Sequence, residues 1–286
     1  MRGQHPVRML CELFEVAPSG YYRWKGREPS ARERTDAEIA KKIEASHRAS
    51  RGAYGAPRIL EDLKEAGVRT SKRRCARIMR EHGIKGRKKH SRRPRTTDSR
   101  HKKPVAANLL AERPEPTGAN QCWLTDITYI ETGEGWLYLA AILDLWSRKI
   151  VGWACAPTLH ASLVIAALHV ALKRRKPPVG LVHHSDRGSQ YVDEAYIMAL
   201  ETAGVVRSMS RPGNCFDNAA MESFWSSLKT ETGLDRTVPL TRSLAELIVF
   251  DYVEAFYNPR RRHSSLGQIS PVAFENKQKQ NDIKAA

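Results

Sequence analysis

The chain has 286 residues, of which 41% are hydrophobic, and a formal net charge of +17. No stretch approaches the roughly 20 uninterrupted apolar residues of a membrane span, and the first residues lack a signal peptide's apolar core, so a secreted or membrane-spanning protein is disfavoured. The five cysteines lie far apart and form no CxxC pair, which excludes a disulfide framework and a zinc knuckle and favours a reducing compartment.

The positive charge is concentrated in the first part of the chain. Residues 1–118 hold 30 basic and 14 acidic side chains, a net charge of +16, whereas residues 119–286 hold 18 and 17. Residues 69–103 alone hold 16 basic and 2 acidic side chains. This density predicts a polyanionic partner, because basic side chains displace counterions from phosphates. A solvated linker is the alternative interpretation of the basic segment.

The first elements in the chain are predicted to be helices. Apolar residues have helical spacing over 6–16, and the segment APSGYYRW that follows is typical of a turn with an aromatic cluster. The next helix is expected to begin at Thr35, which has capping-box spacing with Glu38, and to run to about His47.

A helix-turn-helix pattern comes next. A helix over 57–66 stops at Gly67, and Ser71 can cap a second helix over 72–82. The second helix presents basic side chains on its outer side, which suits a recognition helix, although a structural hairpin is the alternative. The predicted DNA contacts here and in the basic tail are Arg73, Arg74, Arg77, Lys88, Lys89, Arg92 and Arg93.

The second part of the chain has a different pattern. Strands are expected over 121–130, over 136–155 as two strands around the turn DLWSRK, and later over 181–186 and 205–210, with helices over 162–175, 193–204 and 218–231. Three strands in a meander followed by alternating helices and strands predict an α/β fold, a mixed five-stranded sheet with flanking helices, preceded by an all-α helix-turn-helix region.

A last helix is expected to begin near Ser243, which has capping-box spacing with Glu246. The apolar stripe of this helix is predicted to be Leu244, Leu247, Ile248, Tyr252, Ala255 and Phe256. The predicted domain organisation is an N-terminal helical segment (1–30), a helix-turn-helix domain with a basic tail (35–97), a linker (98–118), an α/β core (119–275) and a polar tail (276–286).

Three carboxylates of the second part occupy unusual positions. Asp126 lies inside an apolar strand, Asp186 closes the strand LVHHSD, and Glu222 lies one turn into a helix. A buried carboxylate is costly unless it is paired, hydrogen-bonded or bound to a cation. Taken singly, each has an ordinary alternative: a hydrogen-bonded edge residue, an Asx turn and a solvated helix residue, respectively. Lys229 stands two helical turns after Glu222 on the same face.

The segments around these residues resemble one protein family. WLTDITY, HSDRGSQY, RPGNCFDNAAMESFWSSLK and the terminal FYNPRRRHSSLGQISP are similar to the second-reading-frame (OrfB) transposases of retroviral-integrase-like bacterial insertion sequences. The resemblance covers nearly the whole chain. It implies a ribonuclease-H-like catalytic core, a DDE triad of Asp126, Asp186 and Glu222, and the cutting and joining of DNA at element ends. It also implies DNA contacts by Lys229, Asn218 and Ser189.

The chemistry of such a triad needs a cation. Three carboxylates can hold two Mg²⁺ or Mn²⁺ ions about 4 Å apart, and hard oxygen ligands select these ions. No protein nucleophile is required. His183 and His184 are interpreted as supporting strand residues, because successive side chains of a strand face opposite sides. Arg261 and Arg262, which follow the last helix, are predicted to contact phosphates.

The expected partners are double-stranded DNA at the element ends and the target, and further copies of the chain. The resemblance also implies an upstream first-frame protein, or its frameshift fusion to this chain, as the source of end recognition. A bacterial cytoplasmic location at the nucleoid is expected, with no membrane contact. Two other functions stay open: a non-catalytic DNA-binding regulator of transposition and a ribonuclease-H-like nuclease.

Overall fold

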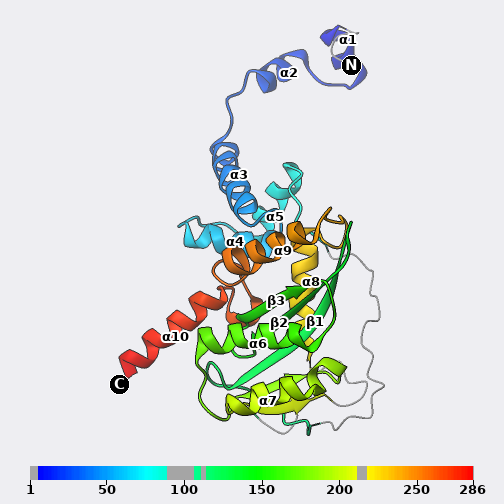
Figure 1. Cartoon of the computed structure of the whole chain (residues 1–286). Coiled ribbons are helices and arrows are strands. Elements are labelled where there is room, and N and C mark those ends of the chain that lie inside the picture. The colour runs from blue at the N-terminus through cyan, green and yellow to red at the C-terminus, as the bar shows by residue number, and fades with distance from the viewer. Residues whose placement is uncertain (1–5, 89–105, 111–113, 211–217, 286) are drawn as a thin grey trace.

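The computed structural model describes residues 6–88, 106–110, 114–210 and 218–285. Its first elements are the short helices α1 (Val7–Leu13) and α2 (Pro18–Lys25). The predicted turn is wrong, because the segment after Ala17 forms α2, with Pro18 in its first turn. The predicted aromatic cluster is confirmed, since the ring of Tyr21 contacts those of Tyr22 and Trp24. Figure 1 shows α1 and α2 lying away from the rest of the chain.

Three helices form the helical region of the protein: α3 (Ala31–Ala49), α4 (Ala56–Glu65) and α5 (Lys72–Glu81). The capping box of α3 is formed by Ser30 and Glu33, so the predicted capping residue, Thr35, lies five residues too late. Ser71 caps α5 as predicted, through a hydrogen bond from the amide of Arg74. The helices pack around a common apolar cluster formed by Ile39, Ile43, Ile59, Leu63, Cys75, Ile78 and Met79.

The second part folds around a five-stranded mixed sheet with the strand order β3-β2-β1-β4-β5. Strands β1 (Cys122–Thr132), β2 (Gly135–Asp144) and β3 (Ile150–Ala156) form an antiparallel meander, while β4 (Val182–Ser185) and β5 (Val206–Met209) run parallel to β1. This architecture confirms the predicted mixed five-stranded sheet with flanking helices, as expected for the ribonuclease-H-like core that the resemblance implies.

The two faces of the sheet are covered by different helices. Helices α6 (Ala161–Arg175) and α7 (Glu194–Thr202) pack with Trp123, Ala140 and Ile142 on one face. Helices α8 (Ala219–Thr232) and α9 (Arg242–Phe250) pack with Leu124 and Ala141 on the other. Alternating strand residues therefore belong to alternate clusters, as the period of a strand requires. The backbone of α6 lies so close to β3 that a Cβ on Gly152 would come within 2.4 Å of the Ala167 carbonyl oxygen.

The helical region and the core share apolar packing. Their buried residues form one cluster, in which the rings of Tyr54 and Phe256 have centroids 6.2 Å apart. Figure 1 shows α4 and α5 next to α9, at the end of the core where α8 also lies. The helix-turn-helix pattern is thus attached to the face of the sheet that carries α8.

The C-terminal part differs from the prediction in three ways. Thr241, not Ser243, caps α9, which continues as the π-helical turn η3 (Asp251–Tyr257). Leu244 and Leu247 are exposed, because α9 buries the neighbouring face with Ala245 and Val249. Residues 276–285 of the expected polar tail lie in α10 (Pro271–Ala285). Within the described residues, no helix has the length and apolar character needed to cross a membrane.

Candidate active site

Two of the predicted carboxylates lie on neighbouring parallel strands. Asp126 is in the middle of β1, and Asp186 follows the last residue of β4. Leu124 pairs with His184 across these strands, so two residues further on the same register places Asp126 beside Asp186. The third carboxylate, Glu222, comes from the first turn of α8, which packs on β1. Three separate elements therefore bring these acids to one end of the sheet.

Asp126 is held by hydrogen bonds to both carboxylate oxygens. Its Oδ1 accepts from the amide of Ile127 at 2.9 Å, and its Oδ2 accepts from the indole Nε1 of Trp225 at 2.9 Å. Burial first, then the negative charge of Asp186 and, least, that of Glu222, together raise the pKa of Asp126 to about 7, against the lowering effect of these two hydrogen bonds. Both other carboxylates are thus close enough to Asp126 to contribute to its raised pKa.

The bond from Trp225 was not predicted from the sequence. Trp225 lies three residues after Glu222 on α8, so the same turn supplies an acid and the indole that fixes Asp126. The only sign of this hydrogen bond in the sequence was a tryptophan at helical spacing from Glu222. The sequence does not show which acceptor the indole N–H of that tryptophan binds.

Asp186 also makes the Asx turn given above as the ordinary alternative. Its Oδ1 accepts from the amide of Gly188 at 2.9 Å. A Cβ at position 188 would lie 3.1 Å from that oxygen, so glycine suits this tight turn. Ser189, which is exposed, begins the short helix η1 (Ser189–Val192) directly after it. The turn orients Asp186 and places Ser189 near the same end of the sheet.

Asn218 and Lys229 occupy the two ends of the α8 segment that carries Glu222. Asn218 is 9% exposed, and its Oδ1 finds no hydrogen-bond donor within the described residues. The Nζ of Lys229 donates to the carbonyl of Tyr129 on β1 at 2.8 Å. Burial lowers the pKa of Lys229, while the charge of Asp126 raises it. Lys229 was predicted to contact DNA; in this structure its ammonium group binds a strand carbonyl instead.

The structure places Glu222 less tightly than the two aspartates. Glu222 is exposed, and within the described part of the chain it forms no ion pair or hydrogen bond. Among the same residues, no three His, Cys, Asp or Glu side chains form a cluster ready to hold a metal ion. All the same, the donor set consists of carboxylate oxygens with an orphaned buried amide oxygen on the adjoining helix cap, which is the chemistry that Mg²⁺ and Mn²⁺ prefer.

The neighbouring histidines support the strand, as predicted. His183 is buried, with its Nε2 2.6 Å from the hydroxyl of Tyr196, and burial lowers its pKa to about 3, with a smaller contribution from His184. His184 contacts the hydroxyls of Ser208 and Ser210 through its two ring nitrogens. Both imidazoles are thus used in holding β4 to neighbouring elements.

Several predicted DNA contacts in the helical region are occupied by carboxylates. Arg74 and Arg77 of α5 both bind Asp36 of α3 at 2.6 Å, and Arg77 also binds Glu81. In this structure they hold α5 on α3, and their DNA contacts stay a prediction. Arg73 and Lys88 are exposed. Lys89, Arg92 and Arg93 lie outside the described residues.

The prediction for Arg261 and Arg262 is corrected by their burial. Both are buried; Arg261 binds Glu231 on α8 and Arg262 binds Asp62 on α4. Buried guanidiniums that already bind carboxylates are not available to phosphates. The sequence could not show this, because their counterions lie 30 and 200 residues away in the chain.

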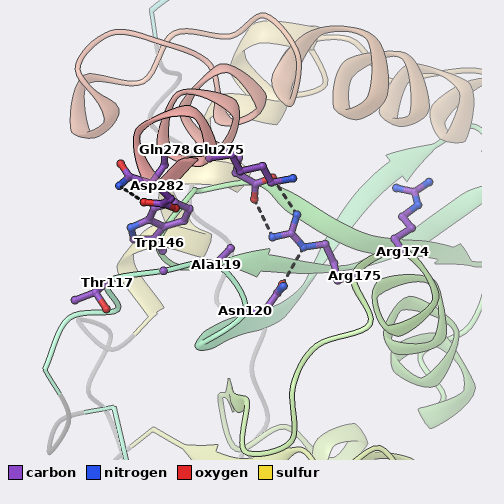
Figure 2. A pocket seen from close by; sticks show the side chains of 11 residues that line it. Thr117, Ala119, Asn120, Trp146, Arg174, Arg175, Glu275, Gln278 and Asp282 are labelled. Atoms are coloured by element: carbon purple, nitrogen blue, oxygen red, sulfur yellow. Dashed lines mark hydrogen bonds and ion pairs between the residues drawn. The ribbon is translucent and has the colours of Figure 1, made fainter. Parts of the chain in front are cut away.

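A cavity of about 390 Å³ lies elsewhere in the core, between α6, α10 and the segment before β1. Figure 2 shows Arg175 at its wall, held by Glu275 and Asn120. None of the residues lining this cavity is one of the three carboxylates. The acids occupy a different part of the sheet.

Comparison with known proteins identifies both regions. An HTH-like domain matches residues 33–92, and integrase core domain models match residues 116–215 and 203–271. Among solved structures, the catalytic core domain of BIV integrase aligns with 57% of this chain and 99% of that chain, with 15% identity and a TM-score of 0.43.

Whole-length relatives are more similar in sequence. The uncharacterized 31 kDa protein of insertion element IS600 from Shigella sonnei is 44% identical, over 94% of this chain and 98% of that protein. Transposase InsF for insertion sequence IS3A from Escherichia coli (strain K12) is 39% identical, over 96% of both chains. Together with the domain matches, these similarities show that the chain belongs to the family of insertion-sequence DNA transposases, DDE polynucleotidyl transferases with an integrase core behind a helix-turn-helix-like domain.

Proposed function

We propose that Asp126, Asp186 and Glu222 are the catalytic triad of this transposase and that they carry the cleavage and joining of insertion-sequence ends. The observation that carries this proposal is the convergence of three acids from β1, β4 and α8. Burial, and after it the charges of Asp186 and Glu222, raises the pKa of Asp126 to about 7. Such mutual repulsion between carboxylates is relieved by a cation, as it is in metal-dependent active sites.

We further propose that two Mg²⁺ or Mn²⁺ ions bind to these acids in the active complex. When bound, the ions activate the attacking water or 3′ hydroxyl and stabilise the leaving oxygen of an in-line displacement. Glu222, exposed at the start of α8, completes the set when DNA is present. Family membership supports a divalent metal in general; the number of ions is our proposal.

The chain's own residues orient the reacting groups. Trp225 and the Ile127 amide hold Asp126 in one rotamer, and the Gly188 amide orients Asp186. The orphaned Oδ1 of Asn218 is an acceptor beside the triad helix, and we propose that it faces the scissile strand. Lys229, now bonded to Tyr129, would reach the element end only by exchanging that carbonyl for a phosphate.

The proposed partner is double-stranded DNA at the element ends and the target. We assign binding to a helix-turn-helix domain with a basic tail (35–97), joined by a linker (98–118) to a catalytic core (119–275), in a homo-oligomer assembled on DNA. Exposed Arg73 and Lys88 are the contacts that the described residues support. Association with the first-frame protein, or fusion to it, and a cytoplasmic, nucleoid-associated location belong to the same proposal.

The triad is tested by Asp186→Asn and Glu222→Gln. Each should abolish Mg²⁺-dependent cleavage and joining of a duplex carrying the inverted repeat that flanks the gene, with affinity for that duplex kept. Glu201→Gln, an exposed acid on α7, is the matched control and should keep wild-type activity. Undiminished joining by either purified triad variant would remove that residue from the triad.

A further inference from the structure

The segment that follows η3 enters between the helical region and α8. Arg262 has only 9% of its side chain exposed, and its guanidinium donates to Asp62 at 2.6 Å and to Glu65 at 2.9 Å, both on α4. It also donates to the carbonyl of Gln268 at 2.7 Å. One buried arginine of the core therefore binds two carboxylates on a helix of the helical region.

The preceding residue, Arg261, binds side chains of α8 instead. Arg261 donates from Nε and Nη2 to the two carboxylate oxygens of Glu231, each at 2.8 Å, and from Nη2 to the hydroxyl of Ser227 at 2.9 Å. The hydroxyl of Tyr252 donates to Glu231 at 2.8 Å. Two adjacent arginines thus connect α4 on one side with α8 on the other.

The helical region also reaches α8 directly. Arg58 of α4 binds the Glu231 carboxylate at 3.3 Å, and Arg87 donates to the Glu231 carbonyl at 2.8 Å. The Tyr54 hydroxyl accepts from the amide of Arg262 at 2.8 Å. Glu231 is therefore bound from the helical region and from the core at the same time.

These ion pairs fix the orientation of the helical region on the core more than they stabilise the contact between the two. A buried ion pair often adds little net stability over apolar packing, since removing charges from water is costly. The apolar cluster containing Tyr54 and Phe256 already joins the two parts. The bidentate fork of a guanidinium adds a fixed direction, which apolar contacts lack.

Glu231 lies nine residues after Glu222 on the same helix, about 14 Å along a rigid rod. We propose that Arg58, Asp62, Glu231, Arg261 and Arg262, here called the clamp, fix the helical region relative to the helix that carries Glu222. DNA bound by the helical region is then cut at a set distance. This inference rests on the proposed function of Glu222 and of the helical region, and the clamp residues are positioning residues.

The test is the position of the cut. Wild type, Arg262→Gln, Asp62→Asn and the milder Arg58→Gln are assayed as full chains on the inverted-repeat duplex, and products are sized to the nucleotide. The clamp variants should raise the fraction of displaced cuts by about 5- to 30-fold, the factor that about 1–2 kcal/mol represents. Arg262→Lys, which keeps the charge, should restore part of the precision.

The matched control is Arg175→Gln. Arg175 is 13% exposed and binds Glu275 at 2.9 Å, a buried pair of the same kind that lies wholly within the core (Figure 2). It should lower stability as the clamp variants do but leave the cut position unchanged. If Arg262→Gln and Arg58→Gln also cut at the wild-type position, the clamp only stabilises and the inference is wrong.

Hydrogen exchange in the DNA-free protein gives a second measurement that does not depend on cleavage. Amides of α4 and the end of α8 should exchange faster in Arg262→Gln and not in Arg175→Gln; equal rates in both would overturn the clamp. Undiminished cutting by Asp186→Asn would instead overturn the proposed function. The exchange rates of Arg262→Gln and Arg175→Gln could still be compared, because that measurement needs no cleavage.

Discussion

Helix α8 carries two glutamates with opposite surroundings. Glu231 is buried among Arg261, Arg58 and Tyr252; burial acts to raise its pKa, but the hydrogen bonds and charges of these groups, Arg261 foremost, hold it below the usual value. Glu222, at the other end, is exposed and binds no cation among the described residues. Where the chain supplies its own cation, the acid holds the structure together. Where it does not, an external cation can enter.

The largest expected effect separates these two glutamates by stability. Glu231→Gln leaves Arg261 buried without its counterion, so it should lower the free energy of unfolding by about 3–5 kcal/mol. Glu222→Gln removes a charge that repels Asp126, so its effect should stay within about 0.5 kcal/mol. Urea unfolding of both variants measures the difference, and similar losses would erase the contrast.

An intermediate effect concerns pH at the clamp. His263 is buried beside Arg261, and burial, followed by the charge of Arg261, lowers its pKa to about 2. The unfolded chain takes up this proton near pH 6.5 and the folded one does not, so stability is lost as pH falls below 6.5. The loss between pH 7 and 5.5 should be about 1 kcal/mol.

Thermal unfolding of His263→Gln against wild type across that range checks this value, and parallel curves would refute it.

The pH dependence of stability that comes from the triad should have the opposite sign. The raised pKa of Asp126 means that its contribution to stability is lost as pH rises through about 7, and Asp126→Asn should remove that dependence.

The smallest expected effect is at the rim between the two parts. Arg51 binds Asp251, but their side chains are 33% and 55% exposed. A pair so open to water contributes about 0–1 kcal/mol. Arg51→Gln should therefore unfold at nearly the wild-type urea concentration, and a loss as large as that of Glu231→Gln would show that burial does not set the strength of these contacts.

The sequence predicted the order of strands and helices well because strand and helix periods are local. It found Asp126 for the same reason, since an acid in an apolar strand breaks the pattern. It failed for the buried face of α9, where two apolar faces compete: Leu244 and Leu247 point one way, Ala245 and Val249 the other. Only packing against β1 and β2 decides between them.

The roles of the arginines show the other limit. A run of basic residues indicates charge but not where the chain brings its counterions. Arg74 and Arg77 bind Asp36, which is 38 and 41 residues away in the sequence, and Arg262 binds Asp62, which is 200 residues away. Prediction of DNA contacts from charge alone therefore counts structural arginines among the ligands.

The most direct test of a metal-dependent triad is the anomalous signal of Mn²⁺ in crystals of the full chain with its inverted-repeat duplex. An ion is expected between the carboxylates of Asp126 and Asp186, with a Glu222 oxygen among its ligands, and none at Glu231. Absence of manganese between the two aspartates, at a concentration that supports cleavage in solution, would contradict the assignment.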